Sequence, residues 1–195
     1  MNNLLIEVAR RYSEPHRKYH TLKHVMGMFT LARDRGIELS DQQVLAIWLH
    51  DIVYRVPADP NESNEMASVR LARGWLSEIC YPTILAVKVA LIIKDTEQEL
   101  PTGGESAVVI DLDLSGLSLN YWKNRKLVRE EYGCYSDEQF KAGRRKWVKG
   151  MLKRKSIFVS GKFDDLEAEA VKNLKKDGLL CCLNEADAKL FAAAD

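Results

Sequence analysis

Apolar residues recur three and four positions apart along most of the chain, which is the spacing of the buried face of an α-helix. Leu22, Val25, Phe29 and Ala32 show this spacing between residues 21 and 35. The same pattern predicts eight helices, over residues 21–35, 40–54, 61–79, 82–93, 105–117, 120–132, 136–155 and 164–176. We therefore predict an all-α fold, a single-domain bundle of helices.

Capping and turn residues support these boundaries. Ser40 is followed three residues later by Gln43, which predicts a capping box at the start of a helix. Pro57 and Pro60 prevent that helix from continuing. The apolar run at residues 107–110 fits a strand or a buried helix equally well, because periodicity does not separate the two. We assign it to a helix, since the rest of the chain is helical.

The length and composition are those of an ordinary globular protein. The chain has 195 residues, of which 46% are hydrophobic and 29% charged, with a formal net charge of +1. This length suits one domain, which we place at residues 1–176. Residues 177–195 are expected to form a tail that is either docked or partly disordered. The charge balance favours neither nucleic acid nor a membrane surface as a partner.

Two further patterns predict a cytoplasmic protein. No apolar run approaches the roughly 20 residues that a membrane-spanning helix needs, and residues 1–11 lack the pattern of a signal peptide. The four cysteines, which include the adjacent Cys181 and Cys182, show no CxxC spacing. We expect them to be reduced thiols in a reducing compartment.

The histidines are the first candidates for chemistry. His16, His20 and His24 are four residues apart, so on a helix they would share one face. His50 is followed directly by Asp51 in an apolar segment, where burying charge is costly unless a partner is present. A divalent cation is one such partner, and imidazole and carboxylate ligands suit Mn, Fe, Mg, Co, Ni or Zn. A single histidine is more often a packed or surface residue, so the pair alone does not decide.

Four short segments in order strengthen the metal interpretation. They are Tyr19-His20-x-x-x-His24, His50-Asp51-x-x-Tyr54, Asn64-Glu65-x-x-Ser68 and Asp111-x-Asp113-Leu114. With these segments the chain resembles the predicted metal-dependent phosphohydrolases of the HD superfamily. Weaker matches extend the resemblance from about Tyr12 to Leu174, among them Arg129-x-Glu131-Tyr132 and Gly143-Arg144.

The resemblance implies a helical bundle of the HD-domain type and a metal held by two histidines and two aspartates. The ligands would be His24, His50, Asp51 and either Asp111 or Asp113. We prefer Asp111, because a buried apolar run precedes it. The two aspartates are two residues apart, so a helix would not direct both at one ion.

The resemblance also suggests which residues meet the substrate. The expected catalytic residues are Asp51, Glu65 and Asp113, with Glu65 acting as a general base or orienting a ligand histidine. The natural phosphate contacts are the basic residues near the first motif, Arg17, Lys18, His20 and Lys23. The alternatives are an exposed turn for Glu65 and a surface ion pair for Arg17.

One departure from the family pattern concerns the fourth predicted helix. Family members often carry a further histidine shortly after its threonine, whereas here Thr96 is followed by Glu97, Gln98 and Glu99. This favours a single metal ion.

A basic run could point to a different ligand. Residues 141–155 hold eight basic side chains, no acidic ones and Trp147. This pattern fits a nucleotide or nucleic-acid patch, but we favour a solvated helix face whose apolar residues pack inward. Tyr121, Trp122 and Tyr135 are likewise predicted to be core residues.

The predicted function is that of a metal-dependent phosphohydrolase acting on a small phosphorylated molecule such as a nucleotide. Neither a membrane nor nucleic acid is expected as a partner, and a homodimer stays open. The main alternative is an HD-fold regulatory protein that binds metal or nucleotide without turnover, which the departure after Thr96 favours. The retained histidines and aspartates favour the enzyme. An HD-fold oxygenase with two iron ions would need more histidines.

Overall fold

The computed structural model describes residues 2–182, and within them the regular structure is helical. The elements are α1 (Asn2–Tyr12), α2 (Leu22–Asp34), α3 (Asp41–Leu49), α4 (Asn64–Glu78), α5 (Thr83–Gln98), α6 (Gly104–Leu114), the short 3₁₀ helix η1 (Ser115–Leu117), α7 (Tyr121–Glu131), α8 (Asp137–Met151) and α9 (Asp164–Leu180). The predicted all-α fold is confirmed for this part of the chain. None of these helices is long and apolar enough to cross a membrane.

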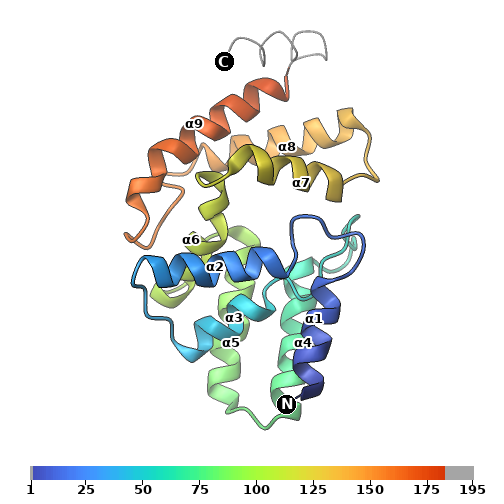
Figure 1. Ribbon diagram of the computed structural model, residues 1–195, viewed down its shortest axis with the longest axis vertical. Helices are drawn as coiled ribbons and strands as arrows, with labels where there is room; N and C mark the ends of the chain where they lie inside the picture. The colour runs from blue at the N-terminus through green and yellow to red at the C-terminus, as the bar shows by residue number, and fades with distance from the viewer. Residues whose placement is uncertain (1, 183–195) are drawn as a thin grey trace.

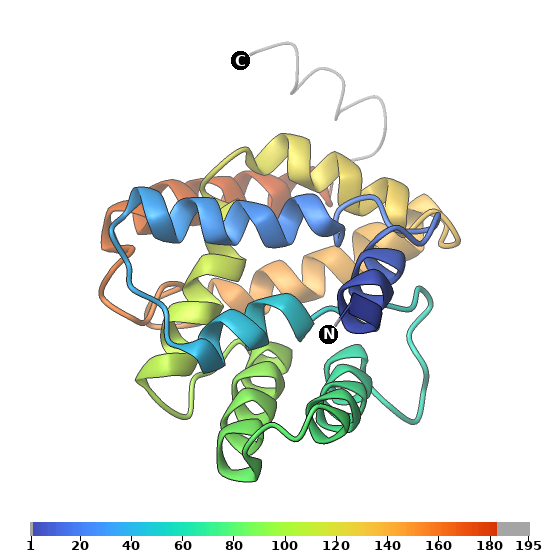
Figure 2. The same ribbon diagram turned by 60° about the horizontal axis from the view of Figure 1, so that its bottom comes forward.

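The helices form two groups joined through the middle of the molecule (Figure 1). α1, α3, α4 and α5 occupy the lower half of the view, α7, α8 and α9 lie across the top, and α2 and α6 lie between them. α6 packs against α2, α3 and α5, and η1 packs against α7 and α9. In the second view (Figure 2) α7 lies above α2, and α9 lies behind it. The junction between the two groups is where the candidate site lies.

α6 is the central element of the core. Seven consecutive residues, from Ser106 to Leu112, are buried, which explains why this segment shows no amphipathic pattern. The choice of a helix over a strand at residues 107–110 is confirmed. The apolar rings of Phe158 and Phe163, from the loop between α8 and α9, extend the same core.

Local sequence signals explain the starts of two helices. Ser40 and Gln43 form the predicted capping box at α3, with the Ser40 side chain accepting from the Gln43 backbone and the Gln43 side chain bonding back. Ser136 and Gln139 form a second capping box at α8. Each box satisfies two N–H groups that a helix start would otherwise leave without partners.

The structure corrects the sequence interpretation at the N-terminus. The eight predicted helices do not include α1, although its Val8 and Tyr12, four residues apart, are both buried. Tyr12 is buried and donates a hydrogen bond to the Trp48 carbonyl at 3.0 Å. His16 and His20 precede α2 and so do not share a helix face with His24.

The C-terminal boundary also differs from the prediction. α9 continues beyond residue 176 to Leu180, so the first part of the expected tail is helical. Asp177 is fully buried there and accepts hydrogen bonds from Tyr121, Arg125 and Arg144. The rest of the expected tail, residues 183–195, lies outside the described residues. Asp177 thereby ties α9 to α7 and α8.

We expect Asp177→Ala to lower the free energy of unfolding by about 3–5 kcal/mol, because it leaves two guanidinium groups without their buried counter-ion. Asp165→Ala, in the same helix, removes an exposed partner of Arg35 and should cost less than about 1 kcal/mol. Urea unfolding followed by circular dichroism measures both. Equal losses in the two variants would contradict the structural role of Asp177.

Candidate metal centre and substrate cavity

Four side chains from three parts of the chain converge at the junction between the helix groups. His24 lies in the first turn of α2, His50 and Asp51 follow the end of α3, and Asp113 lies near the end of α6. The His24 Nε2 atom is 2.9 Å from Asp113 Oδ1, and the His50 Nε2 atom is 3.0 Å from Asp51 Oδ2. Ligand atoms of His24, His50 and Asp51 all lie within 4.8 Å of one another.

The hydrogen bond on the far side of the His50 ring determines what its near side can do. His50 Nδ1 is 3.0 Å from the Ile47 carbonyl oxygen, which only accepts, so Nδ1 carries a proton. In neutral imidazole the Nε2 atom then carries a lone pair and no proton. That lone pair faces the carboxylates of Asp51 and Asp113, at 3.0 and 3.7 Å. Such an arrangement requires a cation between the atoms.

The cluster therefore fits a divalent cation. The Nε2 atoms of both His24 and His50 are buried, and their contacts with the carboxylates lack the geometry of a hydrogen bond. Two imidazole nitrogens and two carboxylates are ligand types that divalent transition metals accept. A carbonyl on the other ring nitrogen is also the usual way in which a protein orients a ligand histidine.

In the absence of metal a proton would take this place. Burial opposes a charged imidazole, but the negative charges of Asp51 and Asp113 outweigh it and raise the pKa of His50 to about 9. Burial likewise opposes charge on Asp51 and Asp113, and the neighbouring histidines outweigh it and lower the pKa of both carboxyls. The site thus holds ionised ligands that a metal can share by displacing the proton.

Asp113, rather than Asp111, joins the cluster, which reverses our preference. Asp111 is buried on another side of α6, where it accepts backbone N–H bonds from Val159 and Ser160 at 2.8–3.1 Å. It also accepts the Ser160 hydroxyl at 2.5 Å. Its carboxylate therefore holds the loop between α8 and α9.

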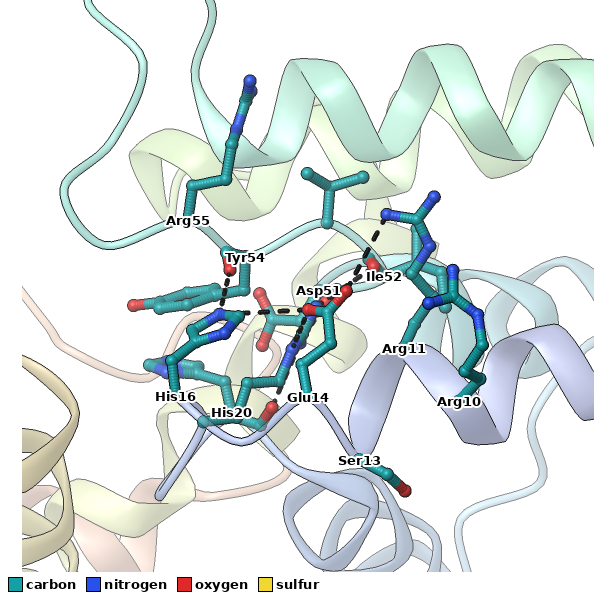
Figure 3. A network of polar contacts seen from close by, with 12 residues as sticks. Arg10, Arg11, Ser13, Glu14, His16, His20, Asp51, Ile52, Tyr54 and Arg55 are labelled. Carbon is teal, nitrogen blue, oxygen red and sulfur yellow. Dashed lines mark hydrogen bonds and ion pairs between the residues drawn. The ribbon is translucent and has the colours of Figure 1, made fainter.

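Arg17 is a structural residue and not the expected phosphate contact. Its side chain is fully buried, and its guanidinium donates to the carbonyls of His20, Asp51 and Ile52 and to the Glu14 carboxylate, at 2.7–3.1 Å. Figure 3 shows the surrounding network, in which the Glu14 carboxylate also lies near Arg11 and His16. Arg17 thus fixes the backbone before His24 and at Asp51 and Ile52, and it is neither free for phosphate nor a surface ion pair.

His20 remains available to a ligand. Its ring lines the cavity described below, is stacked on Tyr54 at 3.8 Å, and its Nδ1 is 2.5 Å from Glu131 Oε1. Burial opposes its charge, but Asp51 and Glu131 outweigh it and raise the pKa of His20. The pKa of Glu131 is lowered to about 2, because the His20 contact outweighs burial. His20 can therefore present a positive charge.

A cavity of about 640 Å³ opens beside the cluster. His50, Asp51 and Asp113 lie in its wall. The wall also includes three acidic residues: Glu65 of α4, Glu97 of α5, and Glu99, which directly follows α5. The side formed by α7, α8 and the segment between them is aromatic and basic, with Tyr121, Arg125, Tyr132, Tyr135, Phe140, Arg144 and Trp147.

A smaller cavity, of about 280 Å³, also reaches the cluster. It includes His24 and Asp113 together with Lys18 and Lys23. The Lys18 ammonium donates to the Pro15 carbonyl at 2.9 Å. The two predicted lysine contacts therefore lie beside a different cavity from that of His20.

The three motif residues of the segment Asn64-Glu65-x-x-Ser68 differ in role: Asn64 and Ser68 bond the backbone, and Glu65 lines the cavity. Asn64 bonds both the N–H and the carbonyl of Arg55, and the Ser68 hydroxyl contacts both backbone groups of Val53. They hold the loop that follows Asp51. Glu65 is half-buried and lines the cavity, and burial together with nearby carboxylates raises its pKa.

Arginines on two helices are the site residues that sequence reasoning missed. Arg144 belongs to the basic run, whose neighbours Arg145 and Lys146 are exposed as expected, but Arg144 lines the cavity. The only sequence feature that pointed to Arg144 was the Gly143-Arg144 match in the resemblance to the HD superfamily. Arg125 had no signal in the sequence. Trp147 is half-buried against the core as predicted, and it lines the cavity as well, whereas Trp122 is exposed.

Comparison of the chain with known protein families, curated proteins and solved structures found no match. The interpretation of the site therefore depends on its own geometry.

The two aspartates of α6 provide a matched test of the cluster. Asp113→Asn should weaken divalent metal binding at least about ten-fold, because it removes a charged ligand. Asp111→Asn should leave metal binding intact and lower stability by about 1–3 kcal/mol, because the amide cannot serve all the N–H groups of the loop. Titration calorimetry with Mn²⁺ and thermal unfolding separate the two. Loss of metal binding in Asp111→Asn alone would reverse the assignment.

Proposed function

We propose that the protein is a metal-dependent phosphohydrolase with a fold of the HD-domain type. The observation that carries this proposal is the pair of buried histidine Nε2 atoms without hydrogen-bond partners, which face two carboxylates at the wall of a large cavity. The resemblance of the sequence motifs to the HD superfamily supports the same function. The proposed ligands are His24, His50, Asp51 and Asp113.

The ligand set favours a transition metal. Mg²⁺ prefers an octahedral shell of oxygen atoms, whereas imidazole nitrogens suit Mn, Fe, Co, Ni and Zn. When bound, such an ion supplies a Lewis acid that polarises a phosphoryl oxygen and increases the acidity of water.

The chain's own residues would position the phosphate and move protons. His20, held by Glu131 and stacked on Tyr54, presents its charge to a phosphate oxygen. Glu65 is the candidate for proton transfer, because its raised pKa brings it closer to neutral pH, where a general acid or base is most effective. Arg17 takes no direct part and instead fixes the backbone at Asp51.

The cavity indicates a small-molecule substrate. Its volume of about 640 Å³ lies within the range of small-molecule sites. Its aromatic wall offers flat surfaces such as Trp147 and Tyr135 to a ring of the substrate. A phosphate ester with a planar group, such as a nucleotide, suits both ends of the cavity.

We expect protein purified without added metal to contain about one transition metal ion per chain by elemental analysis, and to release phosphate from small phosphate esters. The double variant His50→Ala/Asp51→Ala should lose both properties, because it lacks two of the four proposed ligands. A folded wild type that neither contains metal nor is stabilised by Mn, Co or Ni would contradict the proposal. Metal and nucleotide binding without phosphate release would instead support a regulatory binding protein.

Glu65→Gln should lower kcat by about 10²–10⁴-fold while metal content stays the same, because the amide cannot exchange a proton. Glu78→Gln is the control, since Glu78 is exposed on the same helix and its loss should not affect turnover. Steady-state kinetics with elemental analysis test the pair. An unchanged kcat in Glu65→Gln would exclude Glu65 from proton transfer.

A further inference from the structure

Two arginines of the C-terminal helices share one buried carboxylate in the wall of the large cavity. Arg125 comes from α7 and Arg144 from α8, and both ion-pair with Asp177 of α9. The Arg144 Nε atom donates to Asp177 Oδ2 at 2.8 Å, and the Tyr121 hydroxyl donates to the same oxygen at 2.6 Å. The arginine side chains are 21% and 14% exposed, and Asp177 is fully buried.

The charges of this cluster do not cancel. Burial opposes the charge of Asp177, but its bonds to Tyr121, Arg144 and Arg125 outweigh this and lower its pKa, so it stays ionised. One carboxylate then faces two guanidinium groups, which leaves one positive charge in a partly desolvated place. Glu99, another carboxylate of the cavity wall, pairs with Arg154 instead. A second anion is what the two arginines can still accept.

Within residues 2–182, the guanidinium groups have N–H groups left for such an anion. Each carries five N–H donors. Arg144 donates to Asp177 and to the Tyr121 hydroxyl, and Arg125 donates to Asp177 and weakly to the Cys181 sulfur. Since both side chains also line the cavity, the remaining donors can meet a ligand there. The guanidinium fork matches a phosphate or carboxylate group.

The arginines and the proposed metal site face the same space. His50, Asp113, Arg125 and Arg144 all line the large cavity. Its walls come from the two helix groups that Figure 1 shows below and above the middle of the molecule. The Arg144 guanidinium also lies over the Trp147 ring at 4.3 Å, which fixes its plane beside a flat apolar surface.

We propose that Arg125 and Arg144 form an anion-binding subsite for a second anionic group of the substrate, a phosphate or a carboxylate. The reaction part of this inference rests on the proposed function, with the scissile phosphate ester at the metal cluster. Anion binding by the arginines does not depend on it. The substrate is then an organic phosphate with two separated anionic groups, and an ester with an uncharged tail is a poor substrate.

Anion binding by metal-free protein tests the subsite alone. Titration calorimetry after treatment with EDTA should show binding of inorganic phosphate, and titration with succinate shows whether a carboxylate suffices. Arg144→Gln and Arg125→Gln should each weaken binding about ten-fold or more, since each removes a charge-assisted donor group. Each variant leaves the other arginine on Asp177, and circular dichroism verifies the helical fold. Arg145→Gln is the matched control, because Arg145 is the exposed neighbour of Arg144 on α8.

Kinetics then connect the subsite to the reaction. For an alkyl bisphosphate, Arg144→Gln should raise KM about ten-fold with little change in kcat, whereas an alkyl monophosphate should show similar KM in both proteins. Loss of anion binding in the two variants without any hydrolysis would support the subsite and contradict the proposed function. Anion binding that is absent in folded wild type, or equal in Arg144→Gln, Arg125→Gln and Arg145→Gln, would overturn the subsite whether or not the protein hydrolyses esters.

Discussion

The central constraint of the structure is the meeting of two imidazole nitrogens and two carboxylates in its core, a group that fits a divalent cation. The Ile47 carbonyl commits one nitrogen of His50 to donating, so the other faces Asp51 and Asp113 as an acceptor. A proton or a metal must separate them, since acceptor groups repel at these distances. The packing of helices α2, α3 and α6 holds these four groups together in the core, although their mutual repulsion is unfavourable without a cation.

Buried charges around the cluster have a different character, because backbone groups satisfy them. Arg17 donates hydrogen bonds to three backbone carbonyls. Asp111 accepts them from the Val159 and Ser160 N–H groups, and Glu131 accepts them from three backbone N–H groups at residues 18–20. Saturated charges of this kind stabilise irregular backbone that has no helical hydrogen bonds of its own. Arg17 and Glu131 hold the backbone before His24 and at Asp51, and Asp111 holds the loop between α8 and α9. The Nε2 atoms of the cluster, by contrast, have no hydrogen-bond partner among the described residues. Saturation thus separates the structural charges from those proposed to bind a ligand.

The two helix groups contribute different chemistry to one cavity. The N-terminal helices, with α6, supply Glu65 and three of the proposed metal ligands, His50, Asp51 and Asp113, and α7 and α8 supply arginines and aromatic rings. Asp177 links α7, α8 and α9, so the basic wall has a rigid support. In the proposed function the distance between the two walls would select the length of the substrate.

The sequence alone determined the properties that depend on neighbours along the chain. Helical periodicity and caps such as Ser40 predicted the all-α fold, and the order of the motifs identified His24, His50 and Asp51 as partners. The tertiary structure decided which way each side chain faces. It placed Asp113 and not Asp111 at the cluster, buried Arg17 among carbonyls, and turned Arg125 and Arg144 toward the cavity. These choices depend on contacts between segments far apart in the sequence, whereas periodicity describes only the face of a single helix.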